Sequence, residues 1–156
     1  MKIYTLGHST RSFEEFLSIL KKFEIQLVVD VRRWPSSKKF PWFNKENLEE
    51  ELAKNEIEYT HLPELGGFRK GGYEVFSKSE EFEDVIKNLL EIINGKIAAI
   101  MCAEWNPAKC HRWYISEKLN EMGREVIHII SLEKCQNHSE LPKKKLKIKC
   151  DKLKFF

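Results

Sequence analysis

The sequence predicts one α/β domain, a three-layer sandwich around a mostly parallel, Rossmann-like sheet of about five strands. Short apolar segments alternate with helices, or with stretches long enough to form one, and this alternation is typical of parallel sheets. The segment 97–102 is apolar at every position, as expected of a central strand that is covered on both faces. The chain has 156 residues, of which 42% are hydrophobic, and this suits a single core.

In the first half of the chain the predicted elements are strands at 3–6, 27–31 and 57–61 and helices at 12–23 and 44–55. Ser12 and Glu15 have the spacing of a capping box at the start of the first helix, and apolar residues then recur at helical spacing. The second strand is β-branched and apolar, and Asn44 is the predicted N-cap of the second helix. The third strand alternates and is therefore expected to be more exposed.

In the second half the predicted elements are a glycine-rich loop at 62–78, helices at 79–94 and 110–122, and strands at 97–102 and 126–130. The first of these helices has one continuous apolar stripe, and Gly95 and Gly123 end the two helices. Loops as long as 62–78 inside a small domain are usually functional, so we expect this one to close over a ligand.

Charge and composition separate the chain into an α/β domain at 1–132 and a lysine-rich tail at 133–156. The formal net charge is +3, but from Lys134 onward eight lysines stand against two acidic residues. The tail is interpreted as a solvated arm, a nucleic-acid contact or, through its alternating segment 145–150, an extra edge strand. The abundance of lysine and glutamate resembles a thermophile's composition.

No apolar run is long enough to cross a membrane and no signal peptide precedes the first strand, so a cytoplasmic protein without a membrane partner is expected. Four cysteines are too few for a secreted disulfide scaffold, and we expect reduced thiols.

Polar side chains gather where the predicted strands end. Ligands bind beyond the carboxyl ends of the strands in open α/β sheets, so these residues are expected to meet in one crevice. They are His8, Ser9 and Arg11 after the first strand, Asp30 and Arg32 at the second, His61, Glu64, Gly66 and Gly67 after the third, Cys102 and Glu104 at the fourth, and His128 in the fifth.

The segment from Cys102 to Arg112 has the most specific chemistry, because a strand end, a short loop and a helix start follow one another. Arg112 shares a helix face with apolar residues, and a charge there requires a partner, for which Glu104 or Asp30 is available. An arginine beside a helix amino end favours a phosphate or another oxyanion. Cys102 is the candidate nucleophile, although free cysteines are as often simply buried.

The remaining predicted roles follow from the same crevice. His111 or His8 moves protons, Glu104 or Asp30 orients them, and Arg32, Arg112 and Arg11 bind the anion. Cys110 either occupies an inert position, caps the helix or resolves an oxidised Cys102. Asp30 and Arg32 are equally well read as a buried ion pair.

Metal chemistry is the weaker alternative, and no cofactor is expected. Cys102, Cys110 and His111 are soft ligands, but their spacing lacks the paired pattern of structural zinc sites. The second cysteine pair of a zinc deaminase is missing, and Ala108 stands where a protein-phosphatase loop requires arginine.

Four segments resemble the family called domain of unknown function 488 (DUF488). They are Tyr4-Thr5-Leu6-Gly7-His8-Ser9-Thr10-Arg11, Val29-Asp30-Val31-Arg32 with Pro35 and Phe40-Pro41-Trp42-Phe43-Asn44, Tyr59-Thr60-His61-Leu62-Pro63-Glu64-Leu65-Gly66-Gly67, and Cys102 through Arg112. The resemblance covers about residues 3–130 and implies an α/β fold with these residues at its site, but it implies no assigned reaction.

Two function classes therefore remain. The leading hypothesis is an enzyme, a cysteine-dependent hydrolase or transferase, that acts on a nucleotide or another phosphate-bearing partner. Aromatic residues such as Trp34 and Trp105 alternate with cations, which suits a stacked base whose phosphate is held electrostatically. The second hypothesis is a non-catalytic module that binds nucleic acid or anions through its rim and tail.

Overall fold

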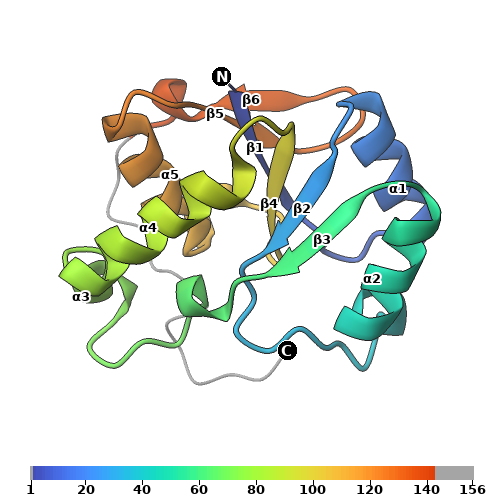
Figure 1. Ribbon diagram of the computed structural model, residues 1–156, viewed down its shortest axis with the longest axis horizontal. Coiled ribbons are helices and arrows are strands. Elements are labelled where there is room, and N and C mark those ends of the chain that lie inside the picture. The colour runs from blue at the N-terminus through green and yellow to red at the C-terminus, as the bar shows by residue number, and fades with distance from the viewer. Residues whose placement is uncertain (1, 143–156) are drawn as a thin grey trace.

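The computed structural model describes residues 2–142 and confirms an α/β fold with a mostly parallel sheet (Figure 1). The sheet has six strands in the order β3-β2-β4-β1-β5-β6. Their bounds are Lys2–Gly7 (β1), Leu27–Asp30 (β2), Glu58–His61 (β3), Ala98–Cys102 (β4), Glu125–Ile129 (β5) and Cys135–Asn137 (β6). The first five run parallel, and β6 pairs with β5 in the antiparallel direction.

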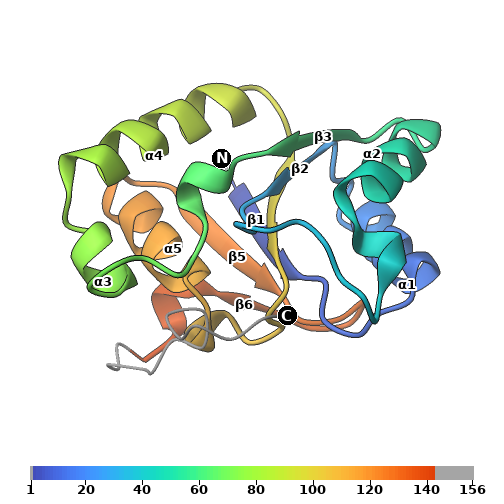
Figure 2. The ribbon, with the colours of Figure 1, turned by 90° about the horizontal axis from the view of Figure 1, so that it is seen from below.

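Helices cover both faces of this sheet, which gives the predicted three layers. Figure 2 shows α1 and α2 on one side of the sheet and α3, α4 and α5 on the other. The bounds are Phe13–Lys22 (α1), Lys45–Lys54 (α2), Tyr73–Phe76 (α3), Glu80–Ile93 (α4) and Arg112–Glu121 (α5).

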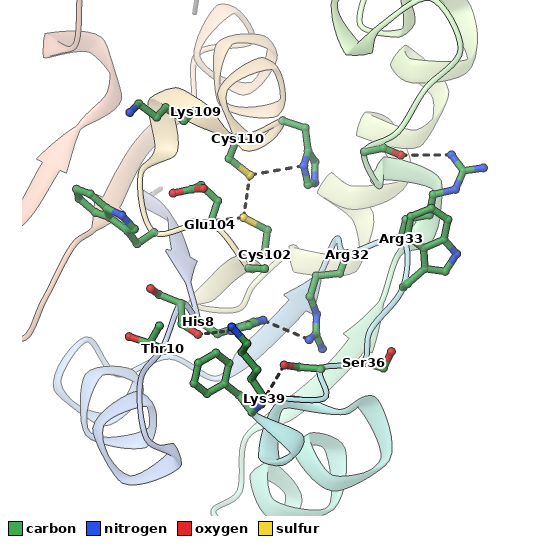
Figure 3. Close-up of a pocket in the computed structure, with 18 of the residues that line it drawn as sticks. His8, Thr10, Arg32, Arg33, Ser36, Lys39, Cys102, Glu104, Lys109 and Cys110 are labelled. Atoms are coloured by element: carbon green, nitrogen blue, oxygen red, sulfur yellow. Dashed lines mark hydrogen bonds between the residues drawn. The ribbon is translucent and has the colours of Figure 1, made fainter. Parts of the chain in front are cut away.

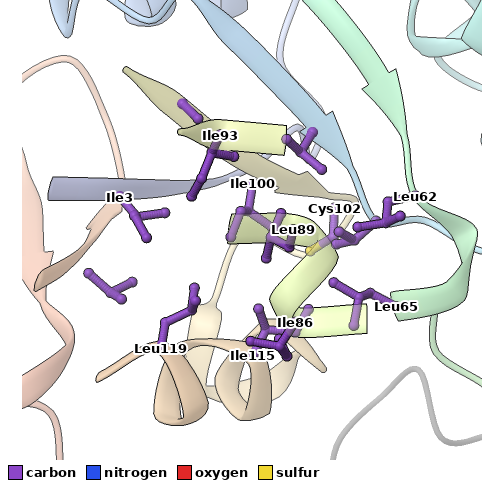
Figure 4. Packing of buried hydrophobic residues seen from close by; sticks show 14 of the residues in the cluster. Ile3, Leu62, Leu65, Ile86, Leu89, Ile93, Ile100, Cys102, Ile115 and Leu119 are labelled. Carbon is purple, nitrogen blue, oxygen red and sulfur yellow. The ribbon is translucent and has the colours of Figure 1, made fainter. Parts of the chain in front are cut away.

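Strand β4 separates two hydrophobic cores because its side chains alternate between them. Ile100 and Cys102 pack with α4 and α5, whereas Ala99 and Met101 pack with α1 and α2. All five β4 residues are buried, as its unbroken apolar run predicts. Figure 4 shows the first of these cores, with Cys102 among its members. Cys102 is therefore held by buried neighbours from β4, α4 and α5.

Of the two predicted N-caps, Ser12 forms its side-chain hydrogen bond and Asn44 does not, and Ser79 caps α4 without having been predicted to. Ser12 Oγ accepts a hydrogen bond from the Glu15 amide at 3.1 Å, and Ser79 Oγ accepts one from the Phe82 amide at 3.1 Å. Asn44 occupies the N-cap of α2, but its Oδ1 accepts from the Ser37 amide at 2.6 Å instead. That bond fixes the segment between β2 and α2, which forms part of the cavity described below.

The structure differs from the sequence-based expectations in three places. The last predicted helix begins at Arg112 rather than at residue 110, because Pro107–Lys109 forms a separate 3-10 turn. The predicted loop 62–78 contains a 3-10 turn at Pro63–Leu65 and the short helix α3. Strand β6 lies within the segment interpreted as a tail, and the alternating residues 145–150 lie outside the described part of the chain.

No helix within residues 2–142 is long and apolar enough to cross a bilayer.

Candidate functional site

The carboxyl ends of β1, β2 and β4 open into a cavity of about 480 Å³ (Figure 3). Its lining comes from the segments that follow these strands, from the loop after β3 and from the start of α5. The lining residues are His8, Ser9, Thr10, Arg32, Arg33, Trp34, Ser36, Ser37, Lys38, Lys39, Phe40, Gly67, Phe68, Cys102, Ala103, Glu104, Trp105, Lys109, Cys110 and His111.

The ends of β1 and β4 continue side by side beyond the sheet and build one wall. The amide of His8 donates to the Cys102 carbonyl at 2.8 Å, and the amide of Ser9 donates to the Ala103 carbonyl at 3.0 Å. Gly7 allows this approach, because a Cβ there would collide with the carbonyl of Glu104. Two segments almost a hundred residues apart thus present their side chains to the same space.

Two cysteine sulfurs form the floor of the cavity. Cys102 Sγ lies 2.8 Å from Cys110 Sγ, and Figure 3 shows the two side chains pointing toward each other. Both residues are free cysteines and only 2% exposed. Burial and the neighbouring Cys110 raise the pKa of Cys102 well above its ordinary value. Cys102 therefore remains a protonated thiol that can donate a hydrogen bond.

Cys110 has the surroundings of a thiolate. The backbone amide of Arg112, at the start of α5, donates to its sulfur at 3.5 Å, and Nδ1 of His111 lies 3.5 Å from the same sulfur. Nε2 of His111 is 3.2 Å from the Val31 carbonyl, which can only accept, so this nitrogen carries the proton. Nδ1 is then the nitrogen that exchanges a proton with Cys110.

Arg112 lies behind the floor and does not line the cavity, although its position in the sequence predicted contact with a ligand. Its guanidinium is completely buried and donates to Thr5 Oγ1 at 2.8 Å and to the Glu104 carbonyl at 2.6 Å. Burial works against this charge, but Cys102 and Cys110 raise the pKa of Arg112. The guanidinium therefore lies behind the two sulfurs. It contacts the backbone carbonyl of Glu104 and not the side-chain carboxylate that the sequence suggested as its partner.

Asp30 and Arg32 form a buried ion pair, one of the two predicted readings. Arg32 donates to Asp30 through Nε at 2.9 Å and Nη2 at 2.7 Å, and Tyr59 donates to the same carboxylate at 2.5 Å. Burial and this carboxylate raise the pKa of Tyr59. Asp30 does not line the cavity, whereas Arg32 does. The pair therefore presents a fixed guanidinium edge to the cavity.

His8 is held as a neutral ring between Arg32 and Phe43. Burial, and then the charge of Arg32, lower its pKa from 6.5 to about 4. Nδ1 lies 3.0 Å from the Ser9 carbonyl and Nε2 lies 3.4 Å from Arg32 Nη1, so Nδ1 donates and Nε2 accepts. The ring stacks on Phe43 with centroids 4.4 Å apart. Near neutral pH, His8 offers no proton to a ligand.

The mouth of the cavity combines cations with aromatic rings. Its charged lining includes Arg33, Lys38, Lys39 and Lys109 with one carboxylate, Glu104. Trp34 and Trp105 are 47% and 52% exposed. Exposed indoles beside cations suit a planar anionic ligand.

Several predicted site residues lie outside the cavity lining. Arg11 donates to the carbonyls of Gly7 and Ile130. His61 bonds the Arg32 carbonyl at 2.7 Å, and Glu64 is exposed to solvent. Gly66 packs against Arg33 and supports the loop in which Gly67 does line the cavity.

For two features of the site, the sequence did not predict the role that the structure indicates. The prediction placed the main chemistry at Cys102, whereas the Cys110-His111-Arg112 run carries the contacts expected of a thiolate. The adjacency of cysteine, histidine and a helix start was the available signal. Thr5, which binds Arg112, gave none, because a threonine inside a strand usually only packs.

Within residues 2–142 no group of three or more histidine, cysteine or acidic side chains is arranged to hold a metal ion. Comparison with known proteins gives one finding. The model of a family described as Domain of unknown function DUF488 matches residues 12–119, which run from the cap of α1 into α5. No curated protein and no solved structure matches the chain.

Proposed function

Because the chain belongs to the DUF488 family, whose description names no reaction, we propose its function from the site: a cysteine-dependent hydrolase or transferase for a phosphate-bearing, nucleotide-type ligand. The observation that carries this proposal is a pair of thiols with a histidine on the floor of a cavity whose mouth is cationic and aromatic. Floor and mouth supply the two things that such an enzyme needs, a nucleophile and a site for its substrate.

The mouth explains the choice of ligand. Lys39 and Lys109 line it as cations, and Arg33 stands beside Trp34 with its guanidinium 5.7 Å from the ring centroid. Phosphate oxygens pair with such cations, and a base stacks on an exposed indole at a gain of about 1–3 kcal/mol. The cavity volume of about 480 Å³ lies within the range of small-molecule sites.

The floor explains the chemistry, with Cys110 as the nucleophile and Cys102 as its hydrogen-bond donor. The Cys110 thiolate forms a bond to the electrophilic atom of the ligand, and the bond to the leaving group breaks as His111 returns a proton to it. Water or a second substrate then attacks the covalent intermediate, gives its proton to His111 and releases Cys110. The Arg112 amide and guanidinium favour the thiolate throughout.

Cys102 was the predicted nucleophile, and it remains the alternative in this scheme. Its high pKa, which results from burial and from Cys110, makes it the poorer thiolate and the better donor. If Cys102 were the nucleophile, His111 would not contact the reacting sulfur directly, because His111 lies beside the sulfur of Cys110.

Alkylation against pH tests the thiol. In a chain with Cys135 and Cys150 changed to serine, iodoacetamide is expected to label Cys110 with a midpoint below the ordinary thiol value of about 8.5. Cys110→Ser should abolish the low-pH labelling, and Cys102→Ser, the matched control, should leave one reactive thiol. An ordinary profile in both single variants would exclude an activated nucleophile.

Calorimetric titration tests the ligand, with adenosine monophosphate and inorganic phosphate as probes. Lys39→Gln should weaken both ligands, whereas Trp34→Ala should weaken only the nucleotide, by about tenfold. Lys54→Gln, on the exposed face of α2, is the control that should change neither. Equal binding of the nucleotide by all four proteins would contradict a nucleotide site at this mouth.

A non-catalytic nucleic-acid module is the second candidate, and the same cationic, aromatic mouth supports it. Its signature is an oligonucleotide affinity that falls steeply with salt while the cysteine variants bind as well as the unchanged protein.

A further inference from the structure

A chain of hydrogen bonds leaves the floor of the cavity and runs along the face of the sheet that α5 covers. Arg112 Nη1 donates to Thr5 Oγ1 at 2.8 Å, and Thr5 Oγ1 lies 2.5 Å from His128 Nδ1. His128 Nε2 lies 2.8 Å from His138 Nδ1, and His138 Nε2 lies 2.6 Å from Glu117 Oε1. The chain starts in α5, passes through β1, β5 and the turn after β6, and returns to α5 (Figure 1).

With His138 neutral, one arrangement of protons satisfies every link, because the Glu117 carboxylate can only accept and so fixes the direction of each bond back to Thr5. Arginine can only donate, so the Thr5 oxygen accepts from Arg112 and its own proton points to His128 Nδ1. His128 then carries its proton on Nε2 and donates to His138, which donates through Nε2 to the Glu117 carboxylate. Burial, and then the charge of Arg112, lower the pKa of His128 to about 2, which keeps this ring neutral.

Burial makes the arrangement rigid. Thr5, His128 and Arg112 are completely buried, and His138 is 2% exposed. Buried polar groups cost free energy unless they are paired, so each member holds the next in a single orientation. His138 also packs against Trp113, with ring centroids 4.6 Å apart, which limits rotation of its ring.

The series of hydrogen bonds ends at the Arg112 guanidinium. Within the described residues 2–142 this cation forms no ion pair with a carboxylate. The Arg112 guanidinium donates to a hydroxyl and a carbonyl and lies against the sulfurs of Cys102 and Cys110. A buried cation requires a compensating negative charge, and a thiolate at the floor supplies one. The position of the guanidinium therefore decides how strongly that thiolate is favoured.

We propose that Glu117, His138, His128 and Thr5 form a positioning relay that fixes Arg112 beneath the cysteine pair and thereby sets the reactivity of Cys110. The proposal rests on the proposed function, because it assigns the relay to the same nucleophile. Thr5, His128 and His138 touch no ligand and act through Arg112. The relay adds the segment after β6 to the working parts of the site.

Other charges act on the same sulfurs, and the test must leave them in place. The titratable and charged groups around the floor are Cys102, His111 and Arg112 with Glu104 and Lys109 from the β4–α5 segment, His8 and Arg32 across the cavity, and His128 behind Arg112. A substitution at Thr5 leaves all of these side chains in the protein and changes only the hydrogen bonds of Arg112 and His128.

Thr5→Val and Thr5→Ser form the matched pair. Valine keeps the shape but removes the hydroxyl, so Arg112 loses its acceptor and His128 its donor; serine keeps the hydroxyl. The readout is the pH midpoint of Cys110 alkylation by iodoacetamide in the Cys135→Ser/Cys150→Ser chain. Thr5→Val is expected to raise the alkylation midpoint by about one pH unit, which is a loss of about tenfold in rate at neutral pH. Thr5→Ser should keep the midpoint of the unchanged protein.

His138→Phe tests the far end and covers the case in which Thr5→Val does not fold. Phenylalanine keeps the packing on Trp113 but leaves His128 without its acceptor, so the midpoint should rise in the same direction. Folded variants with an unchanged midpoint would overturn the relay even if the unchanged protein has an activated thiol. An ordinary midpoint in the unchanged protein would instead overturn the proposed nucleophile, while the difference between the Thr5 variants still decides the relay.

Discussion

The Sγ atoms of Cys102 and Cys110 lie 2.8 Å apart, one at the end of β4 and the other just before α5. This separation is longer than a disulfide bond but shorter than a van der Waals contact between two thiol sulfurs. The raised pKa of Cys102 makes it the protonated partner, and its sulfur also lies 3.6 Å from the Glu104 carbonyl, which can accept from it. Consequences of this relationship can be measured directly.

Mild oxidation should join Cys102 to Cys110. With diamide as the oxidant, the two thiols lose two protons and two electrons, which reduce the diazene to the hydrazine. Peptide mapping should find a disulfide between these residues, a mass lower by two hydrogens and no alkylation of either sulfur until a reductant is added. Cys135, which is exposed, should remain free to alkylate in the monomer. A disulfide that involves Cys135 instead would contradict the pairing.

Acid should destabilise the protein through His8. The pKa of this histidine falls from 6.5 to about 4 on folding, mainly through burial, so between these values the unfolded chain binds a proton that the folded protein refuses. Stability is therefore complete above pH 6.5 and decreases as the pH falls toward 4, by up to about 3 kcal/mol.

The matched variant is His8→Gln. Urea unfolding between pH 7 and 4 should show a smaller loss of unfolding free energy in His8→Gln than in the unchanged protein, because one source of the pH dependence is gone. The buried His128 contributes in both proteins, so the difference between the two slopes isolates His8. Parallel slopes would show that His8 keeps an ordinary pKa.

Breaking the buried Asp30–Arg32 pair should destabilise the fold strongly. Asp30→Asn leaves the Arg32 guanidinium, 6% exposed, without its carboxylate, and the expected loss of unfolding free energy is about 3–5 kcal/mol. The double variant Asp30→Asn/Arg32→Gln should lose less unfolding free energy than the two single variants together, because it leaves no unpaired charge in the core. Lys54→Gln, which removes an exposed pair with Glu51, should unfold like the unchanged protein.

Gly7→Ala should disrupt the wall of the cavity. A Cβ at this position would collide with the Glu104 carbonyl and lie 2.7 Å from the Cα of Trp105, so β1 and the segment after β4 would have to separate. We expect a loss of about 3 kcal/mol in urea unfolding together with weaker nucleotide binding. Gly95→Ala is the control: its φ of +76° is unfavourable for alanine, but nothing lies within 4 Å, so it should cost about 1 kcal/mol and leave binding unchanged.

The sequence by itself determined the fold class and the edge of the sheet at which the site lies. Apolar periodicity encodes local burial, and this was enough for the sequence along the chain of the first five strands and the four longer helices and for the central position of β4. Because the parallel strands all end at one edge, His8, Arg32, Cys102 and Glu104 could be placed together from their positions alone.

Only the tertiary structure decided what each of these residues faces. Arg112 turns inward to Thr5, Cys110 rather than Cys102 receives the contacts of His111 and the α5 amide, and Asp30 is taken by Arg32. The relay also requires β1 to lie beside β5, although 123 positions separate Thr5 from His128. Side-chain partners of this kind depend on strand order and on the close approach at Gly7, and local patterns in a sequence carry no information about either.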